Sequence, residues 1–159
     1  MSIGNQIMNS KDAISGSLAE CFITIDGNRY NFMQLYKFES KVEKTISEVP
    51  ILGKTGKGHK STGWKGTWSG TAHYNQSVMR ELLLTYKKSG LDVPFDIQVT
   101  NEDETSSIGR QTIIHKNCLT SGGVLAKYDA DAEYLDEEID GTFDDWEMPE
   151  KFSLLTGMK

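Results

Sequence analysis

The sequence predicts a mainly β fold with one α-helix: an antiparallel β-sandwich or barrel against which the helix packs. Most regular segments alternate apolar and polar residues with period two, as strands with one buried face do. Only residues 76–89, midway along the chain, have helical periodicity. No internal repeat is visible, and a length of 159 residues suits one domain with a substantial core. Strands surrounding a single helix favour this architecture.

The N-terminal region is polar and is expected to precede the domain. Its few apolar residues are scattered among Ser, Asn and Gly, so residues 1–19 are predicted to form a flexible arm and residues 20–159 the β-sandwich domain. Residues 21–25 are predicted to form a strand. The turn Asp26-Gly27-Asn28 then leads into a second strand and completes a hairpin.

Two longer strands are predicted at residues 35–44 and 66–74. In the first, charged residues of alternating sign share one face, and Phe38 and Val42 lie on the other. In the second, Trp68, Gly70 and Ala72 share a face, and the glycines indicate close backbone approach. Neither period fits residues 45–65, and a connection of that length is rarely a plain turn. It carries both apolar residues and lysines, so we expect a hairpin arm that lies against another surface.

The rest of the chain contributes the helix and the closing strands. Met79, Leu82, Leu83 and Tyr86 form an apolar stripe on the helix, and Gly90 is expected to end it. Strands are predicted at about residues 93–99, 108–119 and 123–130, with a closing strand at 141–148. Residues 129–147 are rich in Asp and Glu and contain no Lys or Arg.

Composition excludes several classes of function. The net charge of −6 argues against nucleic acid or an anionic membrane as the main partner. Cys21 and Cys118 match no disulfide or zinc spacing, which favours reduced thiols. No signal peptide or membrane-spanning segment is apparent, so synthesis in the cytoplasm is expected.

Near matches to ligand-binding motifs fail in detail. Gly53 and Gly58 resemble a phosphate-binding loop, but His59 interrupts the required Gly-Lys-Ser order and a strand follows instead of a helix. The acidic stretch lacks the glycine and glutamate of a calcium loop, where Tyr134 and Asp140 stand. No local catalytic signature is present. We therefore predict a protein that is not an enzyme and that uses no cofactor and no metal.

The remaining feature is an asymmetry of charge between the basic segment at 45–65 and the acidic segment near the end. Complementary ends allow head-to-tail association, which closes into a ring or continues as a fibre. Two solvated surfaces would explain the same composition.

The central segment resembles the tail tube proteins of contractile phages and defective phage-like particles. The resemblance rests on residues 41–44, 47–49, 51–53 and 58–60, and on Gly63, Gly66, Gly70 and Tyr74. It extends to residues 13–16, 26–27, 86–90, 94–95 and 143–147, and so covers nearly the whole chain.

This resemblance implies a structural subunit that forms hexameric rings, stacked into a hollow tube that conducts DNA during ejection, inside a contractile sheath. The arm at 45–65 would contact neighbouring subunits through Ser47, Glu48, Val49, Ile51, Leu52, Lys54, Lys57, His59, Lys60 and Trp64. A complementary or lumen-facing acidic surface would consist of Asp136, Glu137, Glu138, Asp140, Asp144 and Asp145. DNA would pass through an acidic lumen without specific binding.

The partners implied are other copies of the chain, together with tail sheath, tape measure, baseplate or initiator, and tail terminator proteins. The chain would be located in the virion tail and would not contact a membrane. One alternative is the inner tube of a tail-like bacteriocin or secretion apparatus. Another is a monomeric β-sandwich module that binds an anionic ligand.

Overall fold

The computed structural model describes residues 7–155, 157 and 158, and its strands pair only in antiparallel fashion. The elements in order are the 3-10 helix η2 (Ser10–Asp12), β1 (Ala19–Ile25), β2 (Asn28–Asn31), β3 (Leu35–Val49), β4 (Gly58–His73), α1 (Val78–Ser89), β5 (Phe95–Glu102), β6 (Arg110–Gly122), β7 (Asp136–Phe143) and β8 (Asp145–Glu150). The predicted mainly β fold with one α-helix is confirmed.

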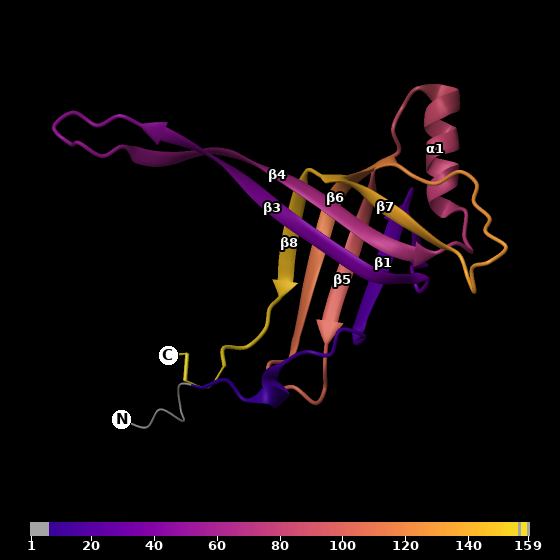
Figure 1. Cartoon of the computed structure of the whole chain (residues 1–159), viewed down its shortest axis with the longest axis horizontal. Helices are drawn as coiled ribbons and strands as arrows, with labels where there is room; N and C mark the ends of the chain where they lie inside the picture. The colour runs from indigo at the N-terminus through magenta and orange to yellow at the C-terminus, as the bar shows by residue number, and fades with distance from the viewer. Residues whose placement is uncertain (1–6, 156, 159) are drawn as a thin grey trace.

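The strands form two layers that share one strand. Sheet A has the order β2-β1-β5-β6-β8, and sheet B has the order β6-β7-β4-β3. The first part of β6 pairs with β8, and its end pairs with β7, where Leu119 lies opposite Thr142. Between these parts Asn117 adopts a positive φ of 52°, which asparagine tolerates better than most residues. The β3–β4 hairpin therefore crosses over sheet A and extends well beyond it (Figure 1).

The core lies between the layers, where the predicted alternation along β4 is confirmed. Trp68 and Ala72 are buried, and the Trp68 ring packs 5.9 Å from that of Phe95 on sheet A. The Trp68 indole N–H donates to the Thr142 carbonyl at 3.2 Å, so its polar atom is satisfied. The same cluster includes Ile23, Ile25, Phe32, Ile97, Cys118, Ile139 and Phe143.

The predicted helix packs against the sandwich through Met79 and Leu82. Gly90 ends it in a left-handed conformation, and its N–H donates to the Tyr86 carbonyl. The next residue after Met79, Arg80, donates to the buried Glu137 carboxylate at 2.7 Å. This ion pair ties α1 to β7.

Two short predictions had different outcomes. The Asp26-Gly27 turn between β1 and β2 is confirmed, and both residues have the positive φ of a type I′ hairpin turn. The strand predicted at 123–130 is wrong, because this segment has no ladder partner. Its carbonyls accept hydrogen bonds from side chains instead: Val124 from Arg80, and Leu125 from Tyr74.

The closing strand predicted at 141–148 is two strands. The chain turns at Asp144, whose N–H donates to the Lys116 carbonyl, so β7 ends in sheet B and β8 begins in sheet A. The segment at 45–65 was also predicted to be irregular throughout. It is largely paired, and only residues 50–57 lie outside β3 and β4.

The N-terminal segment is attached to the body beside the β5–β6 turn. The Ser15 N–H donates to the Asp103 carboxylate at 3.0 Å, and the Ser107 hydroxyl donates to Asp12. Hydrogen bonds from Thr105 and from Ser15 lower the pKa of Asp103. Residues 1–6 of the predicted flexible arm lie outside the described residues, and the division at residues 19 and 20 stays a prediction. No helix within the described part of the chain is long and apolar enough to cross a membrane.

Candidate assembly surfaces

The most prominent feature is the hairpin arm, residues 45–65, which projects from the sandwich (Figure 1). Its strands continue the β3–β4 ladder outward from the body, with Thr45 opposite Gly63 and Val49 opposite Gly58. A register shift between Thr45 and Ile46 marks a β-bulge at its base. The bulge leaves Thr62 of β4 as an extra residue without a partner, and this shifts the apolar–polar alternation of the strand by one position.

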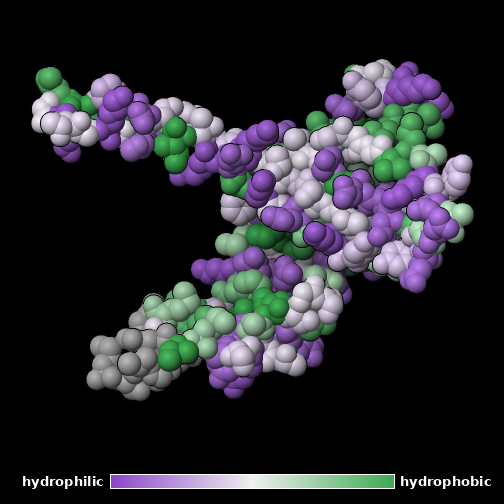
Figure 2. Space-filling view, in the orientation of Figure 1, coloured by the Kyte–Doolittle hydropathy of each residue, from purple (hydrophilic) through white to green (hydrophobic). Residues whose placement is uncertain are grey.

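The arm exposes apolar side chains that the isolated chain leaves in water. Leu52 at the tip is 103% exposed, and Ile46, Val49 and Ile51 are also exposed. Figure 2 shows hydrophobic surface at the tip, beside hydrophilic residues along the stem. A thin two-stranded ribbon has no core of its own, so these residues gain burial only against another surface.

The charges of the arm differ in how far they are already paired. Lys57 Nζ lies 3.4 Å from a Glu48 carboxylate oxygen, and both side chains are exposed, so this pair contributes little stability. His59 lies opposite Glu48 in the ladder. Among the described residues, neither Lys54 nor Lys60 forms an ion pair. These two lysines are available to carboxylates of a partner.

The structure brings together nearly all the residues predicted for this surface. Ser47, Glu48, Val49, Ile51, Leu52, Lys54, Lys57, His59 and Lys60 lie on the projecting part of the arm. Trp64 lies at its base, half exposed, with its ring 6.3 Å from that of Phe143. Trp64 therefore belongs partly to the body. The contact of this arm with other subunits stays a prediction.

A second surface is the outer face of sheet B, which is polar along all three of its long strands. The ladder aligns Lys37 with Thr71 and Glu138, and it aligns Glu39 with Ser69 and Asp140. The sequence placed the charges of β3 on one face, and it left open which of them would face a lumen. The register places Lys37, Glu39, Lys41, Glu43, Lys65, Asp136, Glu138 and Asp140 together on this side.

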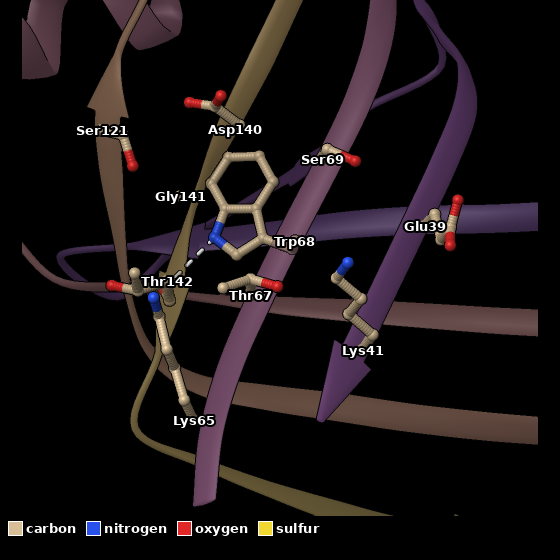
Figure 3. Close-up of a pocket in the computed structure, with 10 residues that line it drawn as sticks. All are labelled: Glu39, Lys41, Lys65, Thr67, Trp68, Ser69, Ser121, Asp140, Gly141 and Thr142. Carbon is tan, nitrogen blue, oxygen red and sulfur yellow. Dashed lines mark hydrogen bonds between the residues drawn. The ribbon is translucent and has the colours of Figure 1, made fainter. Parts of the chain in front are cut away.

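Part of this face is hollowed. A depression of about 400 Å³ lies over Trp68, between the charged side chains of β3 and Asp140 of β7 (Figure 3). Lys41 and Lys65 come from β3 and β4, and Ser121 reaches it from β6. Carboxylates outnumber lysines on the whole face, so it is mildly acidic with mixed signs.

The predicted acidic surface does not form one patch. Asp136, Glu138 and Asp140 lie together on the outer face of sheet B, and their role as a complementary or lumen surface stays a prediction. Glu137 points the other way, is buried, and pairs with Arg80, so its assignment to an exposed surface is wrong. Asp144 and Asp145 lie at the corner between β7 and β8, a separate place. Period two along β7 could have separated Glu137 from its neighbours, but its partner Arg80 is distant in sequence.

One hydrogen bond fixes the end of this face. The Tyr36 hydroxyl donates to Asp136 at 2.7 Å, which joins β3 to β7 across the end of β4. This bond raises the pKa of Tyr36 to about 12. The His73 ring lies between those of Tyr36 and Tyr134, at 4.9 and 5.6 Å. Sequence reasoning missed this aromatic cluster because its members lie on three separate segments.

Within the described part of the chain, neither a metal-binding cluster nor a reactive thiol accompanies these surfaces. Within the described residues no group of three or more His, Cys, Asp or Glu side chains could hold a metal ion. Burial raises the pKa of both Cys21 and Cys118 to about 12, so neither thiol is a reactive thiolate near neutral pH.

Comparison with known proteins places this geometry in a family. Residues 6–150 match the family model described as phage tail tube protein. The chain is 34% identical over 146 residues to the phage-like element PBSX protein XkdM of Bacillus subtilis (strain 168), covering 92% of this chain and 97% of that protein. It is 32% identical over 144 residues to YqbM of the same strain, with coverage of 91% and 95%.

Solved structures show the same fold at lower identity. A chain of the anti-feeding prophage baseplate, six-fold symmetrised, superimposes with a TM-score of 0.64 and 13% identity, over 89% of this chain and 97% of that one. A chain of the sheath–tube complex of an extracellular contractile injection system, PVC, gives a TM-score of 0.57 and 11% identity, over 80% and 86%. Together with the family model and XkdM, these results show that the chain belongs to the phage tail tube protein family.

Proposed function

We propose that this chain is the repeating subunit of a tail tube, which polymerises as stacked hexameric rings around a continuous channel. The observation that carries the proposal is the projecting arm with its exposed apolar residues, on a chain whose family is named for tube formation. Family membership points to a structural role in a phage or phage-like tail, not an enzymatic one. Sixfold rings agree with the C6 symmetry stated for the gene transfer agent tail, a structural neighbour with a TM-score of 0.52.

The outer face of sheet B would line the channel. Its charged and hydroxyl side chains extend along β3, β4 and β7, whereas Trp68, Ile139 and Phe143 of these strands are buried in the core. An excess of carboxylates repels phosphate, so DNA would pass without binding. Joining this sheet to its neighbours around a ring would also cover the free edge of β3.

A contractile sheath, a tape measure protein, an initiating baseplate and a terminator would be its further partners. The neighbouring structures come from particles described as having a baseplate, a sheath–tube complex, and a sheath/tube terminator. Those particles include the anti-feeding prophage and an extracellular contractile injection system. These particles favour a second candidate function, which is the inner tube of an injection particle that carries no genome.

Negative-stain electron microscopy with sedimentation velocity tests the proposal. The purified chain, fresh and after concentration, should form rings or hollow tubes of uniform diameter. Short anionic oligomers are then added to the chain, because the alternative, a monomeric module that binds an anionic ligand, should bind them. A chain that stays monomeric at all concentrations but binds such an oligomer saturably would contradict the tube assignment.

A further inference from the structure

We propose that the arm tip of one copy docks on the β6–β7 loop, residues 123–135, of a second copy. This inference rests on the proposed function and deepens it, because it names the surface that receives the arm. In Figure 1 the arm tip lies at one end of the long axis and the β6–β7 loop at the other. Two different surfaces at opposite ends make a heterologous contact, which continues from copy to copy.

The loop exposes apolar side chains as the arm does. Tyr128 is 92% exposed, and Leu125 and Tyr134 are also largely exposed. Leu91, which follows α1, is exposed as well. Exposed tyrosine side chains are typical anchors of protein contacts, and the exposed leucines add apolar area that burial against a partner would remove from water. They suit the apolar residues Ile51 and Leu52 at the arm tip.

The loop is held in place although it has no ladder partner. The Arg80 guanidinium donates to the Val124 carbonyl, and the Tyr74 hydroxyl donates to the Leu125 carbonyl, both at 3.3 Å. Lys127 Nζ donates to the Asp136 carbonyl at 2.8 Å, and the Asp131 N–H donates to the Asp129 carboxylate at 3.0 Å. A loop ordered in this way presents Leu125 and Tyr128 without a large entropic cost on binding.

Charge complementarity selects a second copy as the occupant. The loop carries Asp129, Asp131 and Glu133, and within the described residues none of them forms an ion pair. The arm carries Lys54 and Lys60, which are also unpaired in the described chain. Opposite charges beside matched apolar anchors set the register of an interface and increase the rate of encounter.

A charge-swap experiment tests the contact. The arm variant Lys54→Glu/Lys60→Glu and the loop variant Asp131→Lys/Glu133→Lys each place like charges together, so each should raise the concentration needed for polymerisation by about tenfold. Asp129 is left unchanged because it holds the turn of the loop. The chain carrying all four changes should polymerise nearly as the wild type does. Lys11→Glu and Glu104→Lys, at exposed positions beside the N-terminal segment, are the matched controls and should have no effect.

Cross-linking adds a readout that does not depend on tube formation. Because burial leaves Cys21 and Cys118 unreactive, cysteines introduced by Leu52→Cys and Tyr128→Cys dominate the thiol chemistry. A concentrated mixture of these two variants should form disulfide-linked heterodimers at least about tenfold faster than a mixture of Leu52→Cys and Tyr30→Cys, in which the second tyrosine lies on β2.

The outcomes separate this inference from the proposed function. The arm–loop contact would be overturned if both charge variants formed tubes normally. It would also be overturned if the chain with all four changes polymerised no more readily than the weaker of the two charge variants. In either case the proposed tube would be unaffected. Equal cross-linking by Tyr30→Cys would overturn the arm–loop contact too. If the wild-type chain never polymerises but the Leu52→Cys and Tyr128→Cys variants still cross-link selectively, the tube proposal is contradicted and the arm–loop contact is supported.

Discussion

Gly66 and Gly141 allow the strands of sheet B to pack closely around Trp68. A Cβ at Gly66 would clash with the ring of Phe143, and one at Gly141 would clash with the Leu119 carbonyl. Any side chain at Gly66 or Gly141 would displace β7 from its neighbouring strands. The Trp68 indole N–H could then no longer donate to the Thr142 carbonyl on β7. These glycines are therefore requirements of packing, and their φ values are not positive.

Gly66→Ala is expected to destabilise the fold by about 1–3 kcal/mol, the typical cost of overpacking a core. Gly63→Ala on the arm is the matched control, since no atom lies within 4 Å of a Cβ there. It should be neutral or slightly stabilising because alanine restricts the unfolded chain. Urea unfolding of the two variants measures the difference, and equal free energies of unfolding would contradict this account of Gly66.

His115 is a buried base between the layers. Its Nδ1 lies 3.0 Å from the Ile97 carbonyl, which can only accept, so Nδ1 carries the proton and Nε2 accepts from the Ser40 hydroxyl at 2.8 Å. The rings of Phe38 and Phe143 flank it at 5.6 and 5.0 Å. Burial lowers the pKa of His115, and the hydrogen bond to Ile97 opposes this shift only in part.

The lowered pKa of His115 predicts a loss of stability in acid. The unfolded chain binds a proton at His115 near pH 6.5 and the folded chain only at lower pH, so the stability is fully present above 6.5. It should be lost progressively as pH falls from about 6.5 through the pKa of the folded state. The free energy of unfolding between pH 8 and pH 5 measures this. His115→Gln should flatten the dependence, whereas the same change at exposed His59 should leave it intact.

The arm, at the scale of elements, is separable from the sandwich. None of its side chains belongs to the hydrophobic core, and its ladder beyond Trp64 pairs only β3 with β4. Replacing residues 47–60 by Asn-Gly would join Ile46 and Ser61, which face each other in the ladder, through a two-residue turn. The body should keep its cooperative unfolding, while polymerisation should be abolished.

Thermal unfolding and sedimentation velocity of this shortened chain check the prediction. A midpoint within a few degrees of the wild type, together with a monomer at every concentration, is the expected result. If the shortened chain still forms tubes, the arm is not an assembly element. If the shortened chain fails to fold, the arm is needed for the stability of the sandwich, and the prediction that the two are separable is wrong.

Elements with a strong local pattern could be predicted from sequence, and the others could not. The alternation of Trp68, Gly70 and Ala72 follows from one buried face, and Gly90 ends its helix locally. The strand predicted at residues 123–130 failed because Arg80 and Tyr74, far away in sequence, supply hydrogen-bond donors that a neighbouring strand would otherwise provide. The corner at Asp144 depends on β6 pairing with both sheets, which no local pattern encodes. Glu137 could be placed correctly only once Arg80 was known to face it.

At the scale of the whole molecule, the acidic face of sheet B predicts passage of DNA without retention. Tubes of the wild-type chain should not co-sediment with double-stranded DNA at physiological salt. The variant Glu138→Lys/Asp140→Lys should retain DNA at low salt and release it as salt rises, because lysine–phosphate contacts release counterions. Equal retention by both proteins would show that this face does not line the channel.

The separation of the arm and the β6–β7 loop at opposite ends of the long axis gives any polymer built through them a direction. One terminus would display rows of empty loops, and the other would display free arms. A protein that starts growth and a protein that stops it must then have different binding surfaces, since one has to bind free arms and the other has to bind free β6–β7 loops. The first ring would therefore fix the orientation of the whole tube, because every later ring has to add in the same direction.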